Sequence, residues 1–180
     1  MIFEKEGREN TKKTVELALS AVKERKIRYI VVASNSGRTA GLFKGVKDCE
    51  VVCVTHASGF AEKGRNEMPE AVRNELIGSG LKVLTATHVL SGAERGLSRK
   101  FGGVYPVEII ANTLRMFGQG VKVCVEISIM ALDAGLIPYN EPVIAVAGTD
   151  GGADACVILK PAHANSILDT RVIEIICKPL

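Results

Sequence analysis

The sequence predicts an α/β domain of three layers, in which helices cover both faces of a mainly parallel sheet. Short apolar runs alternate with helix-like segments through most of the chain, which is the element order of a parallel α/β sheet. Residues 29–33 and 143–147 are apolar at every position, as expected for strands buried on both faces. The 18 glycines suit the many tight turns that join strands to helices in such a fold.

The first half of the chain repeats the order strand, loop, helix. A helix is expected from Asn10 or Thr11 to about residue 25, because Val15, Ala18 and Val22 recur at helical spacing. Expected strands are residues 28–33, 50–55 and 82–86, with helices at residues 40–44 and 68–77 between them. Residues 87–103 contain four glycines and several charges, so we expect an irregular loop there.

The second half predicts two helices and then strands without a helix between them. Pro106 opens a helix to about residue 117, and residues 121–134 are apolar on nearly all sides, as in a central helix. Strands follow at residues 142–147, 155–159 and 171–177, and we expect antiparallel pairing at this C-terminal edge. No repeat or linker divides the chain, so residues 1–180 are predicted to form a single domain.

Composition and charge argue against several classes of protein. The formal net charge is only +3, and basic residues alternate with acidic ones, so we expect no nucleic-acid partner. Neither a secretion signal nor a membrane-spanning run is visible, which predicts a cytoplasmic protein without a membrane partner. The five cysteines are scattered and include no CxxC pair, so we expect reduced thiols and no metal site.

Polar loops follow four of the predicted strands. Because the carboxyl ends of parallel strands meet at one edge of a sheet, we expect these loops to line one ligand site. The predicted ligand-binding residues outside the first loop are Thr55, His56, Ser58, Phe60, Thr87, His88, Gly92, Gly148, Thr149, Asp150, Gly151 and Gly152.

The first of these loops carries the donors that a phosphate needs. Its residues are Ser34, Asn35, Ser36, Gly37, Arg38 and Thr39. Three hydroxyls, a planar guanidinium and the N–H groups of a helix start could all face one anion. No GxxxxGK[ST] motif is present, which disfavours nucleotide triphosphate hydrolysis. The alternative is a capped helix start with an exposed arginine.

The other loops carry weaker signals. The glycines of residues 148–152 would let backbone amides line a pocket beside Thr149. The alternative is that this turn is only a tight connection, in which the Asp150 side chain bonds its own backbone. His56 and His88 each follow a strand, where an imidazole could transfer protons or serve as a satisfied polar group. Glu108 and Glu126 lie on helices and receive no assigned role.

The segment YIVVASNSGRTA at residues 29–40 resembles the strand and SGR[ST]A loop of the pyruvate kinase C-terminal domain. The strand ending at Val54-Thr55 and the later run with its GTDGG turn at residues 148–152 resemble further parts of that domain, in the same order. Residues 87–115 look like an insertion. The whole chain is similar to small archaeal proteins described as pyruvate-kinase-C-terminal-domain-like.

This resemblance implies a sugar-phosphate-type effector loop at residues 34–39. It also implies that the chain is not a pyruvate kinase, because the active site of that enzyme lies in a separate barrel. For the stand-alone relatives the resemblance suggests flavin mononucleotide (FMN), with its ring across residues 55–60 and 87–92 and its phosphate at Arg38.

Three functions remain open from the sequence. The first is a sensor or carrier domain that binds a small phosphorylated ligand, because no catalytic constellation is evident. The second is a flavin-dependent oxidoreductase, in which the cofactor supplies the chemistry. The third is a structural or interaction subunit, suggested by the apolar helix at residues 121–134, and we also expect a homo-oligomer.

Overall fold

The computed structural model describes residues 1–149 and 151–180, and it is built around one mixed sheet of seven strands. The strand order is β1-β7-β6-β5-β2-β3-β4. Four of the six strand pairings are parallel, and only those of β6 with β5 and with β7 are antiparallel. The strands are β1 (Ile2–Phe3), β2 (Tyr29–Ala33), β3 (Glu50–Val54), β4 (Lys82–Leu84), β5 (Val143–Ala147), β6 (Ala155–Lys160) and β7 (Arg171–Pro179).

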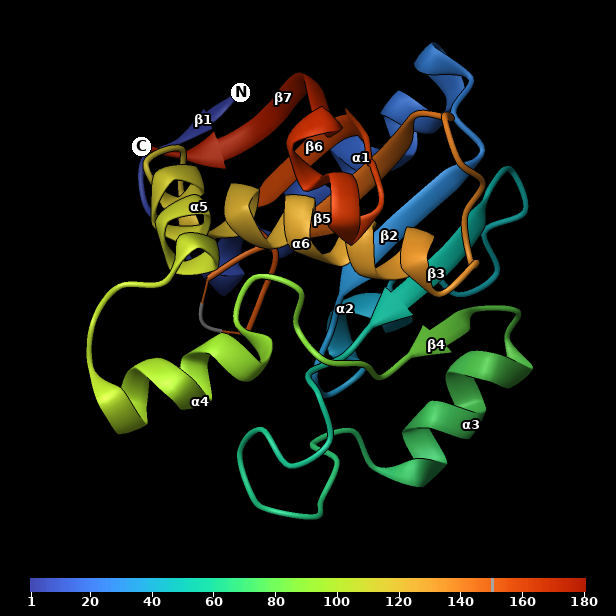
Figure 1. Ribbon diagram of the computed structural model, residues 1–180. Coiled ribbons are helices and arrows are strands. Elements are labelled where there is room, and N and C mark those ends of the chain that lie inside the picture. Colours follow the sequence, from blue (N-terminus) through green and yellow to red (C-terminus); the bar gives the residue numbers. More distant parts are fainter. Residues whose placement is uncertain (150) are drawn as a thin grey trace.

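Helices cover both faces of this sheet, so the predicted three-layer α/β fold is confirmed (Figure 1). Alternate strand residues face two separate cores: Ile30 and Val32 pack on the α1 face, whereas Val31 packs on the α6 face. The helices are α1 (Thr11–Arg25), α2 (Arg38–Gly41), α3 (Glu70–Gly78), α4 (Gly92–Phe101), α5 (Pro106–Arg115) and α6 (Gln119–Asp133), with 3₁₀ turns η1 (Arg8–Asn10) and η2 (Ala164–Asp169).

The apolar helix α6 lies against the middle of the sheet, as its composition predicts. Twelve of its residues are buried, and α5 packs on its outer side. Its apolar surface is therefore part of the core. The observation that suggested a structural subunit is explained by packing within one chain.

The antiparallel strands predicted near the C-terminus are confirmed, and the N-terminus adds a strand that was not predicted. β1 is only two residues long and pairs in parallel with the end of β7. Its sequence is too short to show an alternating pattern, so the pairing depends on a partner about 175 residues away.

Two local predictions were wrong. The loop expected at residues 87–103 contains the helix α4, because its glycines are separated by good helix formers and Gly96 lies on an exposed helix where it is tolerated. The helix expected at residues 40–44 begins at Arg38 instead and ends at Gly41, after which single turns continue to Val46.

The glycine turn after β5 is held against the start of α1. The Ala153 N–H donates to Thr11 Oγ1 at 3.0 Å, and the Gly7 N–H donates to Asp154 Oδ2 at 2.9 Å. A Cβ at Gly152 would lie 2.3 Å from Arg8 Cα, far inside contact distance. The turn and the N-terminal segment can approach this closely only because residue 152 has no side chain.

We expect Gly152→Ala to lower the free energy of unfolding by about 1–3 kcal/mol, because neither backbone can give way cheaply. Urea denaturation followed by circular dichroism measures this. Gly96→Ala is the matched control, since nothing lies within 4 Å of a Cβ at that position and alanine should raise helix stability by up to about 1 kcal/mol. Equal effects of the two substitutions would contradict the close approach.

Candidate functional site

A cleft with two lobes lies at the carboxyl ends of the parallel strands, where the fold class predicts it. The loop lobe has a volume of about 760 Å³ and is lined mainly by the loops after β2 and β5. The helix lobe has a volume of about 550 Å³ and lies between the loops after β3 and β4 and the helices α4, α5 and α6. Asn35, His56 and Gln119 line both lobes, so the two lobes are continuous.

The loop lobe brings together most of the predicted phosphate-binding residues. Ser34, Asn35, Ser36, Arg38 and Thr39 line it from the loop after β2. The exposed Arg38 guanidinium donates through Nε to Ser36 Oγ at 3.2 Å, which orients it beside the hydroxyls. α2 is only four residues long, so its dipole is small, and an anion would depend on individual donors in the loop.

The glycine turn forms the facing wall of the loop lobe. Gly148, Thr149, Gly151 and Gly152 line it, and a Cβ on Gly151 would lie 3.5 Å from the Arg38 guanidinium. Among the described residues, Thr149 Oγ1 has no hydrogen-bond partner although it is buried. Asp150, also a predicted ligand residue, lies outside the described residues.

The helix lobe opens beside a group of aromatic rings. The ring of His56 lies 4.0 Å from that of Phe60 and 5.2 Å from that of His88, measured between centroids. Phe60 is half exposed, so one face of the group is accessible. Thr55 also lines this lobe, and its hydroxyl is engaged with Thr85 Oγ1 at 2.7 Å. These rings form an apolar surface on which a flat ring could stack.

His88 is held in a defined state by its surroundings. Its Nε2 accepts a hydrogen bond from the Ala57 N–H at 3.3 Å, so Nδ1 carries the proton of the neutral ring. Burial lowers the pKa of His88 below its usual value of 6.5, and the attraction of Glu126 opposes this shift only in part. The neutral imidazole therefore predominates at neutral pH.

The lowered pKa predicts acid sensitivity. The unfolded chain binds a proton at this residue below about pH 6.5, whereas the folded chain binds it only at lower pH, so stability falls as the pH drops below 6.5. We expect His88→Asn to reduce the loss of unfolding free energy between pH 7 and pH 5.5. Urea denaturation at each pH measures this, with His163→Asn as control. An unchanged slope would contradict the assignment.

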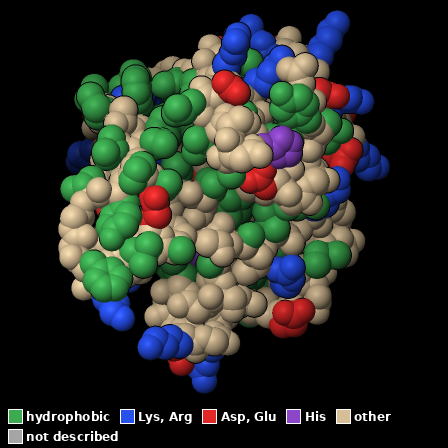
Figure 2. All heavy atoms as spheres, in the orientation of Figure 1, with side chains coloured by type: hydrophobic (Ala, Val, Ile, Leu, Met, Phe, Trp, Pro, Cys, Tyr) green, Lys and Arg blue, Asp and Glu red, His purple; other side chains and the backbone are tan. Residues whose placement is uncertain are grey.

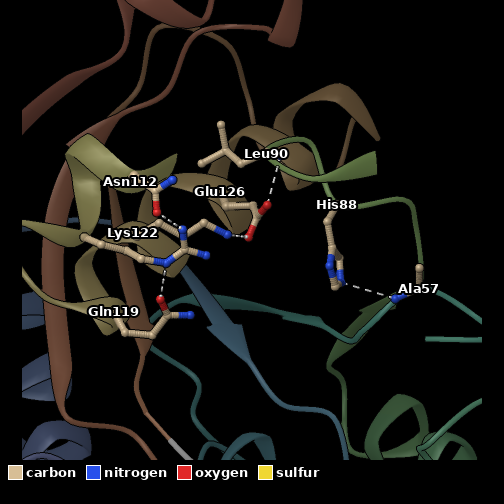
Figure 3. A network of polar contacts seen from close by, with 8 residues as sticks. Ala57, His88, Leu90, Asn112, Gln119, Lys122 and Glu126 are labelled. Atoms are coloured by element: carbon tan, nitrogen blue, oxygen red, sulfur yellow. Dashed lines mark hydrogen bonds and ion pairs between the residues drawn. The ribbon is translucent and has the colours of Figure 1, made fainter. Parts of the chain in front are cut away.

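A buried ion pair closes the inner end of the helix lobe (Figure 3). Lys122 Nζ lies 2.5 Å from Glu126 Oε2, and both side chains are more than nine-tenths buried. Glu126 Oε1 also accepts the Leu90 N–H at 2.9 Å, which ties the loop carrying His88 to α6. The sequence signal for this pair was two opposite charges four residues apart on an otherwise apolar helix.

Polar groups from α5 and α6 extend this network towards the mouth of the lobe. The Arg115 guanidinium donates through Nε to Gln119 Oε1 and through Nη1 to Asn112 Oδ1, both at 2.8 Å. Arg95 of α4 lines the same lobe. None of these residues was predicted, because α5 and α6 were expected to cover the sheet and Arg95 was expected in an irregular loop.

Four predicted site residues lie outside the lining of the cleft, and a glutamate without an assigned role has a structural one. Ser58 and Thr87 are exposed on the surface, and Gly92 is the first residue of α4. Gly37 has a φ of +84° and packs against α3, where a Cβ would lie 2.4 Å from Val72 Cγ1. Glu108 accepts the Ser98 hydroxyl and the Tyr105 N–H, which lowers its pKa and fastens α4 to the start of α5.

The structure also bears on metal and membrane sites. Among residues 1–149 and 151–180, no three His, Cys, Asp or Glu side chains gather as a metal site requires. Within the same residues, every helix is too short or too polar to span a bilayer. Four of the five cysteines are buried, and burial raises the pKa of the Cys53 thiol to about 12.

A family model described as "Pyruvate kinase, alpha/beta domain" matches residues 12–159. The chain belongs to this family. A pyruvate kinase from Cryptosporidium parvum is similar to this α/β domain at 18% identity and a TM-score of 0.43, over 82% of this chain and 21% of that chain. The chain thus spans about a fifth of the length of that enzyme.

The family match confirms the resemblance to the pyruvate kinase C-terminal domain. It includes the loop after β2 and the glycine turn after β5, the two walls of the loop lobe. It also includes α4 and α5, which border the helix lobe, whereas β1 and β7 of this α/β domain lie outside it.

Proposed function

We propose that the cleft binds a small molecule that carries a phosphate group. One observation carries the proposal: the hydroxyl-rich loop after β2, the Arg38 guanidinium and the glycine turn after β5 line the same loop lobe of about 760 Å³. Neutral and charged donors in one concave site suit the several oxygens of a phosphate. The helix lobe would hold the rest of the ligand.

FMN is the ligand that we propose to test first. Its phosphate would meet Arg38 in the loop lobe, and its ring would pass His56 into the helix lobe and lie on Phe60 and His88. The aromatic group and the polar side chains of α5 and α6 support this placement, since a flavin ring has two apolar faces and a polar edge.

The role that we favour is that of a sensor or carrier domain, with a flavin-dependent oxidoreductase as the alternative. We also propose the cytoplasm as its location, in line with the resemblance to small archaeal proteins. The absorption spectrum of the purified protein, with mass spectrometry of what denaturation releases, tests the ligand. Flavin bands and steady turnover with a reduced nicotinamide would favour the enzyme. A colourless phosphorylated metabolite would favour sensing, and a protein that binds no phosphorylated compound would contradict the proposal.

We further propose that the chain forms a homo-oligomer. Large apolar side chains gather on the surface over α4 and α5, which Figure 2 shows on the left side of the molecule. They are Leu97, Phe101, Val104, Ile109, Met116 and Phe117. An apolar surface of this kind is typical of an interface between subunits. Sedimentation velocity measures the state, and a monomer at high micromolar concentration would contradict it.

A further inference from the structure

His56 and Glu67 form a paired imidazole and carboxylate where the two lobes meet. His56 Nδ1 lies 2.5 Å from Glu67 Oε2, and the two side chains are each about one-third exposed. A carboxylate on Nδ1 holds the imidazole in the tautomer whose free electron pair is on Nε2. His56 lines both lobes, and Glu67 lines the loop lobe together with Ser36 and Arg38. The free nitrogen of His56 is therefore a base beside the phosphate loop.

A hydrogen-bond donor lies next to this base. The ring of His88 is 5.2 Å from that of His56, and the Ala57 N–H occupies its Nε2, so its Nδ1–H is left to donate into the helix lobe. A neutral imidazole that donates one hydrogen bond can polarise a carbonyl group without transferring its own proton. Phe60 packs against both histidine rings, with its ring centroid 4.0 Å from that of His56 and 5.1 Å from that of His88.

No nucleophile accompanies the base. The nearest hydroxyl in sequence, Thr55 Oγ1, donates to the His56 carbonyl and pairs with Thr85 Oγ1, so it is not bonded to the imidazole. Among the described residues, His56 Nε2 has no serine, threonine or cysteine partner. This arrangement disfavours acyl transfer and favours a reaction that needs only a base and a polarising donor.

We propose that His56, His88 and Glu67 catalyse enolisation of small phosphorylated hydroxy-aldehydes and hydroxy-ketones. The proposal takes its phosphate anchor at residues 34–39 from the proposed function, and it does not depend on the flavin. His56 Nε2 removes the proton from the carbon next to the carbonyl group. The electrons of that C–H bond form a carbon–carbon double bond, and the carbonyl π electrons move to the oxygen. That oxygen accepts the His88 Nδ1–H.

The reverse step returns a proton from His56 to carbon, so no oxidant, reductant or metal is consumed. Return to the same carbon exchanges its hydrogen with solvent. Isomerisation of the sugar phosphate additionally requires that the proton of the hydroxyl on the deprotonated carbon moves to the former carbonyl oxygen, after which the proton on His56 returns to the former carbonyl carbon. In this scheme His56 and His88 are the catalytic residues. Glu67 does not touch the substrate and is a positioning residue for His56.

The experiment measures proton exchange in deuterium oxide by proton NMR, with dihydroxyacetone phosphate and ribose 5-phosphate as the probes. We expect the natural sequence to exchange the hydrogen next to the carbonyl faster than buffer does. His56→Asn should slow this exchange by about 10²- to 10⁴-fold. His88→Asn should slow it without preventing phosphate binding.

Glu67→Gln separates positioning from structure. The other charged and titratable groups that line the two lobes with His56 all remain in this variant: Arg38, His88, Arg95, Glu108, Arg115, Lys122 and Glu126. Loss of the Glu67 carboxylate should therefore slow exchange while the calorimetric affinity for the probes stays unchanged, because Glu67 orients His56 and does not touch the substrate. His163→Asn is the matched control. Its imidazole also pairs with a carboxylate, Asp133 Oδ1 at 2.7 Å, but lies outside the lining of both lobes.

Binding of the same probes, measured by calorimetry, keeps the two proposals apart. Probes that bind in the micromolar to millimolar range without exchange would overturn the enolisation proposal and leave the phosphate site standing. Probes that do not bind, with FMN also not binding, would overturn the proposed function. Exchange that survives His56→Asn would overturn the role of His56. FMN bound in the same cleft should compete with the probes and slow their exchange.

Discussion

Replacing Arg38 with alanine is expected to weaken the binding of a phosphorylated ligand by about 10- to 100-fold. A hydrogen bond to a charged group contributes about 1.5–3 kcal/mol, and the exposed guanidinium would supply more than one such bond to a phosphate. Calorimetry with FMN measures the effect. Riboflavin, which has no phosphate, should bind the Arg38→Ala variant and the natural sequence equally.

Two further arginine variants sharpen this test. Arg38→Lys keeps the charge but loses the planar fork, so its affinity should fall between those of the natural sequence and the alanine variant. Arg99→Ala removes an exposed arginine of α4 that lines neither lobe, and its affinity should not change. If Arg38→Ala and Arg99→Ala bind FMN equally well, the phosphate does not contact Arg38.

Removing one partner of the buried ion pair should have the largest effect on stability. Glu126→Ala leaves the Lys122 ammonium buried without its counter-charge and the Leu90 N–H without its acceptor. We expect the free energy of unfolding to fall by about 3–5 kcal/mol, the usual cost of breaking a buried pair from one side. Chemical denaturation of the apo protein measures it.

A double-mutant cycle identifies the cause. The double variant Lys122→Met with Glu126→Leu removes both charges and keeps the volume. Its loss of unfolding free energy should therefore be smaller than that of Lys122→Met alone or of Glu126→Leu alone. Glu126→Gln retains an acceptor for the Leu90 N–H and isolates the contribution of the charge. Additive single effects would show that the pair is not energetically coupled.

The order of the elements and the position of the loops followed from local patterns. β2, β3 and β5 are short apolar runs that end at polar loops, and a parallel sheet brings those ends to one edge. The loop after β2, which we propose as the phosphate site, was identified because its hydroxyls, glycine and arginine are consecutive in sequence. The helix α4 was missed because its glycines resemble loop punctuation, whereas its stability depends on Glu94 and Ser98 binding the start of α5.

The remainder of the site depends on contacts between residues that no local sequence pattern connects. Glu67 reaches His56 across an irregular loop, which is closed by the hydrogen bond from the Gly59 N–H to the Arg65 carbonyl. Gly7 reaches Asp154 from 147 residues away and so holds the glycine turn in place. Nothing local distinguishes Glu67 or Gly7 from an ordinary surface residue.

The amino-acid sequence alone therefore determined the α/β class, the edge of the sheet that carries the cleft and the run of hydroxyls, glycine and arginine after β2, because each of these arises from neighbouring residues and strand periodicity. Only the tertiary structure decided which charges are buried, which imidazole meets a carboxylate and how the two lobes join. Those features are set by packing between distant segments, where the surroundings of a side chain, and not its sequence neighbours, fix its protonation and its partners.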